Sequence, residues 1–161
     1  MNKSTLNKIA ALALGLSVVG AANAADETFN IGIKLIAPIV ITETNALSFV
    51  DTVAGTTQDV VTGPADALAA QFSATGEPSR PVTGSVVESS VEVTTGDGVG
   101  STKRMTIQDF TTGGDMSGAG SASFDGSGDL SDLRVGATAK VESDDIPGDY
   151  AGTATFRLVY N

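Results

Sequence analysis

Residues 28–42 have the sequence TFNIGIKLIAPIVIT, in which every second side chain from Phe29 to Ile41 is apolar. Alternation with a period of two predicts a β-strand with one face against an apolar core. At about 3.3 Å per residue this run would span about 50 Å, which exceeds an ordinary strand. Pro38 lacks an N–H and predicts a break into two segments. The second segment fits this domain, whereas the first either reaches a groove in another domain or forms the first strand of a self-contained one.

The N-terminus has the features of a secretory signal. Lys3 and Lys8 precede an apolar run over residues 9–19, and Ala22-Asn23-Ala24 provides a small-residue cleavage site. The apolar run is shorter than the ~20 residues that span a bilayer. We therefore expect residues 1–24 to be a signal peptide and Ala25 to be the mature N-terminus. A retained N-terminal anchor is the alternative.

The composition of the mature chain excludes several classes of function. The formal net charge is −10, and it becomes about −12 once Lys3 and Lys8 are removed. Such an acidic chain lacks the clustered Lys and Arg that nucleic acids and anionic lipids require. The chain has no Cys and no His, so the thiol nucleophile and the commonest general base are both missing. We expect a non-enzymatic protein with no catalytic residues, no cofactor and no membrane insertion of the mature chain.

Further alternating segments separated by turn residues predict an all-β fold. The clearest is residues 133–141, whose expected core-facing side chains are Leu133, Val135, Ala137, Ala139 and Val141. The last one, residues 150–160, alternates up to the end of the chain. Residues 111–132 are rich in Gly, Ser and Asp, and only Ala122 and Phe124 are expected to face inward there. Short strands with regular turns and no long helix predict an immunoglobulin-like antiparallel β-sandwich over residues 37–161.

Three segments carry a resemblance to a known family. IAPIVITETNALSF, AAQFSATGEP and LRVGATAKVESDDIPGDYAGTATFRLVYN resemble the bacterial domain family DUF4402. Both ends of the mature chain also resemble subunits of chaperone–usher pili, because Gly148 and the penultimate Tyr160 stand where such subunits have a Gly and a Tyr. The Cys pair of many pilins is absent, and Gly32 lies among the polar positions of the alternating run.

The pilin resemblance implies an incomplete sandwich that lacks its last strand. A periplasmic chaperone covers the gap, and the N-terminal extension of the next subunit then replaces it by donor-strand addition. Residues 25–36 would be the donor strand, with Phe29, Ile31, Ile33 and Leu35 entering the groove of a neighbour. The chaperone-facing acceptor groove would include Gly148, Phe156, Leu158 and Tyr160. The expected partners are copies of this chain, other pilus subunits, the chaperone and an outer-membrane usher, and the expected location is the bacterial cell surface.

Other interpretations follow from the same residues. The chain could be a self-contained exported β-sandwich that binds a ligand or a matrix component at the cell surface through its loops. The spacing Asp125-x-Ser127-x-Asp129 is similar to the start of a calcium loop. Leu130 and Gly136 occupy positions where such a loop needs Gly and Glu, so a solvated turn is the better interpretation and no metal site is expected.

Overall fold

The computed structural model describes residues 25–161, and the predicted signal peptide, residues 1–24, lies outside the described residues. The described part contains nine β-strands and a single turn of 3₁₀ helix, and it confirms the all-β prediction. The elements are β1 (Val40–Asn45), β2 (Gln58–Thr62), β3 (Ala70–Thr75), β4 (Pro81–Val86), β5 (Ser90–Thr94), η1 (Ser101–Lys103), β6 (Arg104–Gly114), β7 (Ser121–Ser123), β8 (Asp129–Val141) and β9 (Phe156–Tyr160). Over this range, no helix is both long and apolar enough to cross a membrane.

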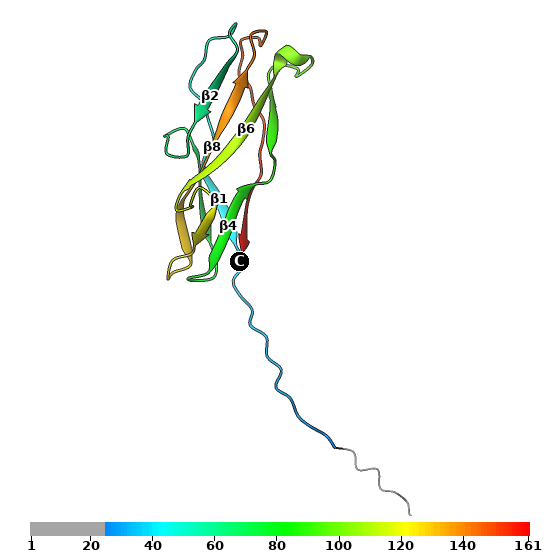
Figure 1. The fold of residues 1–161 in the computed structure, drawn as a ribbon, viewed down its shortest axis with the longest axis vertical. Helices are drawn as coiled ribbons and strands as arrows, with labels where there is room; N and C mark the ends of the chain where they lie inside the picture. The colour runs from blue at the N-terminus through cyan, green and yellow to red at the C-terminus, as the bar shows by residue number, and fades with distance from the viewer. Residues whose placement is uncertain (1–24) are drawn as a thin grey trace, which may run out of the picture. The chain divides into compact units, whose positions relative to one another are not determined.

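The strands form two antiparallel sheets (Figure 1). The larger sheet has the order β1-β3-β8-β6-β5, with β2 pairing the end of β8 that β3 leaves free, and the smaller has the order β7-β4-β9. The order β1-β3-β8-β6 together with the pair β4-β9 matches strands ABED and CF of an immunoglobulin sandwich. The sandwich prediction is therefore confirmed. In that fold a seventh strand follows on the free side of F, whereas β9 pairs only with β4 among the described residues.

Strand β8 forms the centre of the larger sheet, and its alternation agrees with the prediction. The exposed fractions of its five expected core residues run from 0% at Leu133 to 6% at Val141. Gly136 is buried as well, because the backbone carbonyl of Thr62 lies where a Cβ would stand. Side chains on both faces of β8 are buried near Gly136, because the chain at the end of β2 approaches the strand closely.

Strand β6 is longer than its sequence suggests because it contains a β-bulge. Its register against β8 shifts between Gln108 and Thr111, and Asp109 has a φ of 55°. The extra residue changes which side chains share a face. Ile107 and Phe110, three positions apart, consequently both face the same apolar cluster.

The lower part of the sandwich has a closed apolar core. We call it the closed cluster; its buried members are Ala74, Val82, Met116, Phe124, Leu130, Leu133 and Leu158. Ile39 and Ile41 pack against it, so the second half of the alternating N-terminal run belongs to this domain as expected. Met116 and Leu130 were not among the expected inward positions of the Gly-rich stretch. Met116 is buried because its turn folds back toward the start of β8, where the N–H of Asp115 donates to the C=O of Asp132, and Leu130 is buried because it lies in β8 itself, opposite Ala74 of β3.

The C-terminal segment differs from the single strand predicted over residues 150–160. Only Phe156–Tyr160 is strand, and it pairs with β4. Ala151 instead exchanges two hydrogen bonds of 2.9 Å with Thr94 at the end of β5. The chain thus passes from the edge of the larger sheet to the smaller sheet within a few residues, and regular pairing is interrupted during that crossing.

Candidate functional site

An open apolar groove of about 710 Å³ lies over the inner face of the larger sheet. Its floor is a second apolar cluster, which we call the open cluster. The buried members are Val60, Ile107, Ala137, Ala139 and Val141, and the partly buried members are Leu47, Phe49, Val93, Met105 and Phe110. Half of this cluster keeps contact with solvent, so the interior of the sandwich is incompletely covered here.

Two segments form the rims of the groove. One is residues 46–54, which follow edge strand β1, and the other is residues 145–156, which lie beside β5 at the opposite edge of the same sheet. Ala151 directs its N–H and C=O to Thr94, and the C=O of Thr155 accepts from the N–H of Val87. Backbone groups alternate in direction along an extended chain. Those of Gly152 and Ala154 therefore point to the other side, toward the groove.

Glycines allow the second rim to pack closely on β5. A Cβ on Gly148 would lie 2.5 Å from Oγ1 of Thr95, and one on Gly152 would lie 2.8 Å from Cγ1 of Val93. Both separations are too short for real side chains, so glycine is required at these two positions for the observed packing. Gly148, which the sequence resemblance selected as an acceptor residue, lines the apolar groove.

Of two further predicted acceptor residues, Phe156 lies at the boundary of the groove, whereas Leu158 is not among the residues that line it. Phe156 lines the groove and stacks on Phe72 with 4.7 Å between ring centroids. Leu158 is 8% exposed and belongs to the closed cluster. The stacked pair joins the two sheets and separates the open cluster from the closed one.

Tyr160, the fourth predicted acceptor residue, connects the end of the chain to its beginning. Its hydroxyl donates to the C=O of Ala37 (2.9 Å) and accepts from the N–H of Glu77 (2.6 Å). The N–H of Ala37 donates to Oε2 of Glu77 (3.1 Å). The ring lies 5.9 Å from that of Phe124. A Cβ on Gly76 would stand 2.5 Å from this hydroxyl, so the tight β3–β4 turn is part of the arrangement.

A smaller hollow lies beside this contact, lined by residues 36–39 and by Leu158, Val159 and Tyr160. The sequence selected Tyr160 as a site residue but did not select Glu77. The sequence Gly76-Glu77-Pro78 predicted only a break between strands. Its partner Ala37 is distant in sequence, and no local pattern reports such a pairing.

The predicted donor residues are among the most exposed large apolar side chains of the described region. Phe29, Ile31, Ile33 and Leu35 are 79%, 83%, 88% and 84% exposed. None of residues 25–39 belongs to a strand in the structure. Exposed apolar side chains at every second position, in a segment without a sheet partner, have the pattern of a strand that pairs elsewhere.

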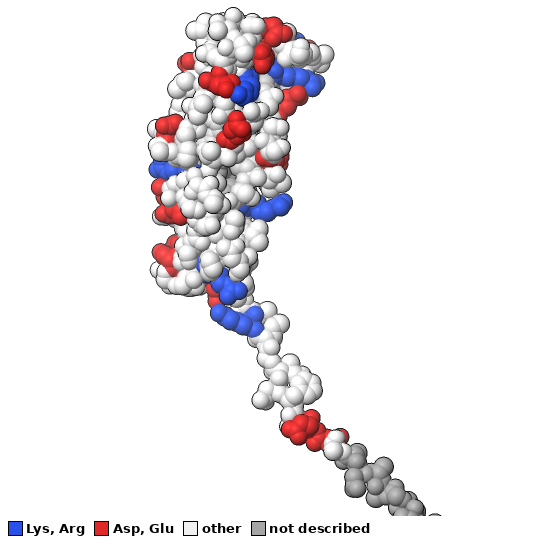
Figure 2. Space-filling model, viewed as in Figure 1, with Lys and Arg blue, Asp and Glu red and all other residues white. Residues whose placement is uncertain are grey.

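The charged groups around the groove are mainly acidic. Glu43, Asp51, Asp145 and Asp149 are among its lining residues, which include no Lys or Arg. Asp145 is 7% exposed and accepts a hydrogen bond from the N–H of Glu142. Burial, and then the nearby Asp145 carboxylate, raise the pKa of the Tyr150 hydroxyl above its ordinary value. Figure 2 shows acidic side chains dispersed over one face of residues 35–161, with fewer basic ones between them.

The Asp125 carboxylate stabilises a turn by accepting hydrogen bonds from its backbone N–H groups. The N–H groups of Ser127 and Asp129 each donate to its Oδ1 at 2.8 Å. Both bonds lower the pKa of Asp125, and the bond from Asp129 has the larger effect. Within residues 25–161 no three His, Cys, Asp or Glu side chains gather in a way that could hold a metal ion.

A model for a protein family described as "Domain of unknown function (DUF4402)" matches residues 38–160. No curated protein and no solved structure gives a match.

Proposed function

We propose that this chain, which belongs to the DUF4402 family over residues 38–160, is a structural subunit of a bacterial surface pilus that assembles by donor-strand addition. The open groove carries this proposal, because it leaves the apolar inner face of the larger sheet uncovered between residues 46–54 and residues 145–156, the segment that leads into β9. An edge strand with unpaired backbone groups is a template for pairing with another chain.

The N-terminal segment has the chemistry that such a groove requires. It is extended, and its exposed apolar side chains at alternate positions all fall on one face of a strand. Burying Phe29, Ile31, Ile33 and Leu35 in a neighbour would stabilise the contact by roughly 6–12 kcal/mol by transfer estimates, as an upper figure. Backbone pairing along the rims would add to this and satisfy their N–H and C=O groups.

Two substitutions on opposite faces of residues 25–36 distinguish this function from a non-specific hydrophobic contact. In the mature chain, residues 25–161, Ile31→Asp places a carboxylate in the apolar groove, where an unpaired charge is costly. Asn30→Asp adds the same charge to the same segment on the opposite face. We expect the first variant to abolish assembly, measured by light scattering and sedimentation, and the second to leave it nearly unchanged. Equal behaviour of the two variants would refute the donor strand.

Export is part of the proposal. Donor-strand addition through a periplasmic chaperone and an outer-membrane usher requires a secreted subunit, which the cleavage site before Ala25 would provide. The first residue of the protein isolated from cells should be Ala25. N-terminal sequencing that returned Met1 would remove the pilus from consideration.

A second function is favoured by the size of the groove. Its volume falls within the range of ~300–1,000 Å³ that small-molecule pockets occupy. The chain would then be a self-contained exported sandwich that binds an apolar ligand. Ile31→Asp should leave binding of an apolar fluorescent probe unchanged in that case, because residues 25–36 would take no part in the site.

A further inference from the structure

Ala37, shortly before β1, is held by both of its backbone groups. Its C=O accepts from the hydroxyl of Tyr160 (2.9 Å), and its N–H donates to Oε2 of Glu77 (3.1 Å). The same hydroxyl accepts from the N–H of Glu77 (2.6 Å), so the three residues form a closed cycle of hydrogen bonds. We call Ala37, Glu77 and Tyr160 the clamp. Hydrogen bonds that share their partners reinforce one another, so the clamp fixes Ala37 more firmly than a single contact would.

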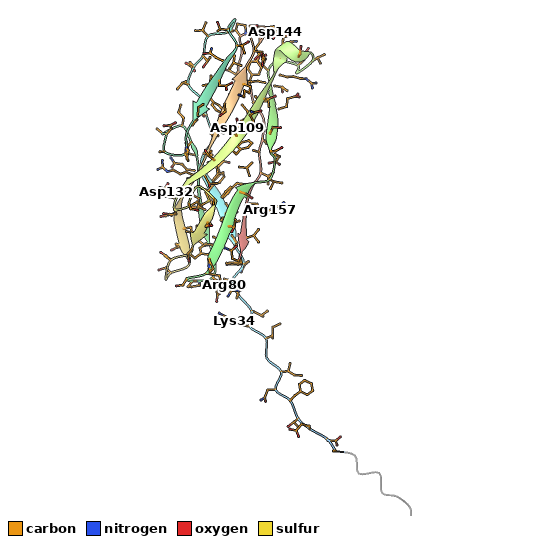
Figure 3. All side chains as sticks on the ribbon, viewed as in Figure 1. Lys34, Arg80, Asp109, Asp132, Asp144 and Arg157 are labelled. Atoms are coloured by element: carbon orange, nitrogen blue, oxygen red, sulfur yellow. The ribbon has the colours of Figure 1, made fainter. Side chains whose placement is uncertain are left out.

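The Tyr160 hydroxyl is held in place by its own ring and strand. The ring packs on that of Phe124 with 5.9 Å between centroids, and Cζ of Arg80 lies 6.0 Å from the centroid of the Tyr160 ring. Pairing of β9 with β4 sets the position of the backbone. Figure 3 shows Arg80 at this end of the domain and Asp144 at the other. The hydroxyl is therefore a preorganised hydrogen-bond donor at the end where Arg80 lies.

The exposure of the chain changes at the clamp. Leu35 is 84% exposed, whereas Ile36 and Ala37 are partly buried and Ile39 packs against the closed cluster. The clamp therefore marks the boundary between the segment that has no sheet partner and the part of the chain that belongs to the core.

Filling of the groove by the same chain would need a reversal of direction at the clamp. From Ala37 the chain continues into β1 and then into residues 46–54, one rim of the groove. Residues that precede Ala37 would have to turn back beside β1 to enter that groove. Residues 33–37, with the sequence Ile-Lys-Leu-Ile-Ala, include none of the residue types that favour turns. Pro38 restricts Ala37 to extended conformations, so a reversal is unfavourable while the clamp is closed.

We propose that Glu77 and Tyr160 are positioning residues that prevent residues 25–36 from filling the groove of their own chain, so that this segment stays available for a second copy. The inference rests on the proposed donor-strand function and names the residues that decide between the two acceptors. Opening the clamp would release Ala37 and add Pro38 to the free segment, where proline favours the second position of a turn. The chain could then reverse close to its own groove.

A single tryptophan reports where the donor segment lies. The chain has no Trp, so Phe29→Trp in the mature chain gives one fluorophore among the apolar donor residues. Its emission is that of a water-exposed indole when the segment is free, and it shifts to shorter wavelength when the side chain is buried. Burial in a second copy depends on protein concentration, whereas burial in the same chain does not. Sedimentation of the same samples measures assembly.

In the Phe29→Trp parent we expect the shift to develop only as the concentration rises and assemblies form. Adding Tyr160→Phe removes the hydroxyl that holds the C=O of Ala37. The ratio of self-filled to free monomer should then rise about twofold to tenfold, the range that the loss of one net hydrogen bond gives. This rise appears as shifted emission at the lowest concentration, together with slower assembly. An unshifted monomer that assembles at the parent rate would overturn the clamp.

Glu77 gives a second test with its own rescue. Glu77→Ala removes the acceptor of the Ala37 N–H and should raise the self-filled fraction as Tyr160→Phe does. Glu77→Gln keeps an amide oxygen as an acceptor and should behave like the parent. Equal self-filling in the two Glu77 variants, or none in either, would overturn the hydrogen-bonding role of Glu77. These variants carry the test if Tyr160→Phe fails to fold.

Thr83→Val is the matched control. Oγ1 of Thr83 donates to Oδ1 of Asn161 (2.9 Å), a bond at the same end of β9 that does not include Ala37. This variant should match the parent. Self-filling equal to that of Tyr160→Phe would show a general loosening of the chain end and would overturn the clamp. A parent monomer with shifted emission at every concentration and no assembly would instead refute the proposed function itself.

Discussion

The closed cluster and the open cluster are built from the same kind of alternating strand, yet only one of them is covered. In the closed cluster Leu133 and Val82 are both completely buried, because β4 and β9 lie over β3 and β8. In the open cluster Phe49, Met105 and Phe110 stay partly exposed over the continuation of β8. The difference is that β4 and β9 cover one end of the inner face of the larger sheet, whereas no strand among the described residues covers the other end.

The largest expected effect comes from the closed cluster. Leu133→Ala would leave a cavity among fully buried neighbours and should lower the free energy of unfolding by about 2–5 kcal/mol. Chemical denaturation of the mature chain measures this loss. A loss below about 1 kcal/mol would contradict the description of this cluster as a tightly packed core.

Phe110→Ala tests the open cluster, the other half of the comparison. Phe110 is only partly buried in the unfilled groove, so the loss of unfolding free energy in monomeric protein should be smaller than for Leu133→Ala, about 1–2 kcal/mol. The same substitution should weaken assembled protein more strongly, since a donor strand would complete the burial. Thermal unfolding of monomer and assembly in parallel tests this, and an equal loss in both states would contradict it.

Gly76→Ala probes the packing at the base of the closed cluster. Its Cβ would stand 2.5 Å from the hydroxyl of Tyr160 and 2.6 Å from the ring of Phe124, and such overpacking costs about 1–3 kcal/mol. Gly118→Ala is the matched control, because no atom lies within 4 Å of its added Cβ. Similar denaturation midpoints for the two variants would show that the turn relaxes freely.

The smallest effect concerns the crossing between the sheets. The N–H of Thr155 donates to Oε2 of Glu88 (2.8 Å), and this bond is the main cause that lowers the pKa of Glu88 below its ordinary value of 4.5. A lowered folded pKa stabilises the fold above the unfolded pKa, and that contribution is lost as the pH falls through the folded value. Glu88→Gln should therefore reduce stability slightly at pH 7 and converge with the parent below about pH 4. A constant difference across this range would contradict the assignment.

Much of the fold could be predicted from the sequence because alternation reports burial directly. It located the inward residues of β8 and the contribution of Ile39 and Ile41. It could not report the bulge at Asp109, since a positive φ at a residue other than Gly has no clear signature. Nor could it divide residues 150–160, because the crossing from β5 to β4 depends on where two sheets meet.

The candidate site was predicted less completely than the fold. Alternation selected the exposed apolar side chains of residues 29–35, and the pilin resemblance selected Gly148, which lines the groove. Alternation alone cannot distinguish a covered inner face from an uncovered one, because both need apolar side chains at every second position. The groove therefore emerged only once residues 46–54 and 145–156 were seen as rims over the open cluster.

Deletion of residues 25–36 from the mature chain tests most directly whether this segment fills the groove of a neighbour. The shortened chain should keep the circular dichroism of the sandwich, with low stability, and should not assemble by itself. Added to the intact mature chain, it should accept a donor strand without providing one, and sedimentation should show progressively shorter assemblies. A shortened chain that unfolds, and that a free peptide of residues 25–36 restores to a native monomer, would show instead that the segment completes its own domain.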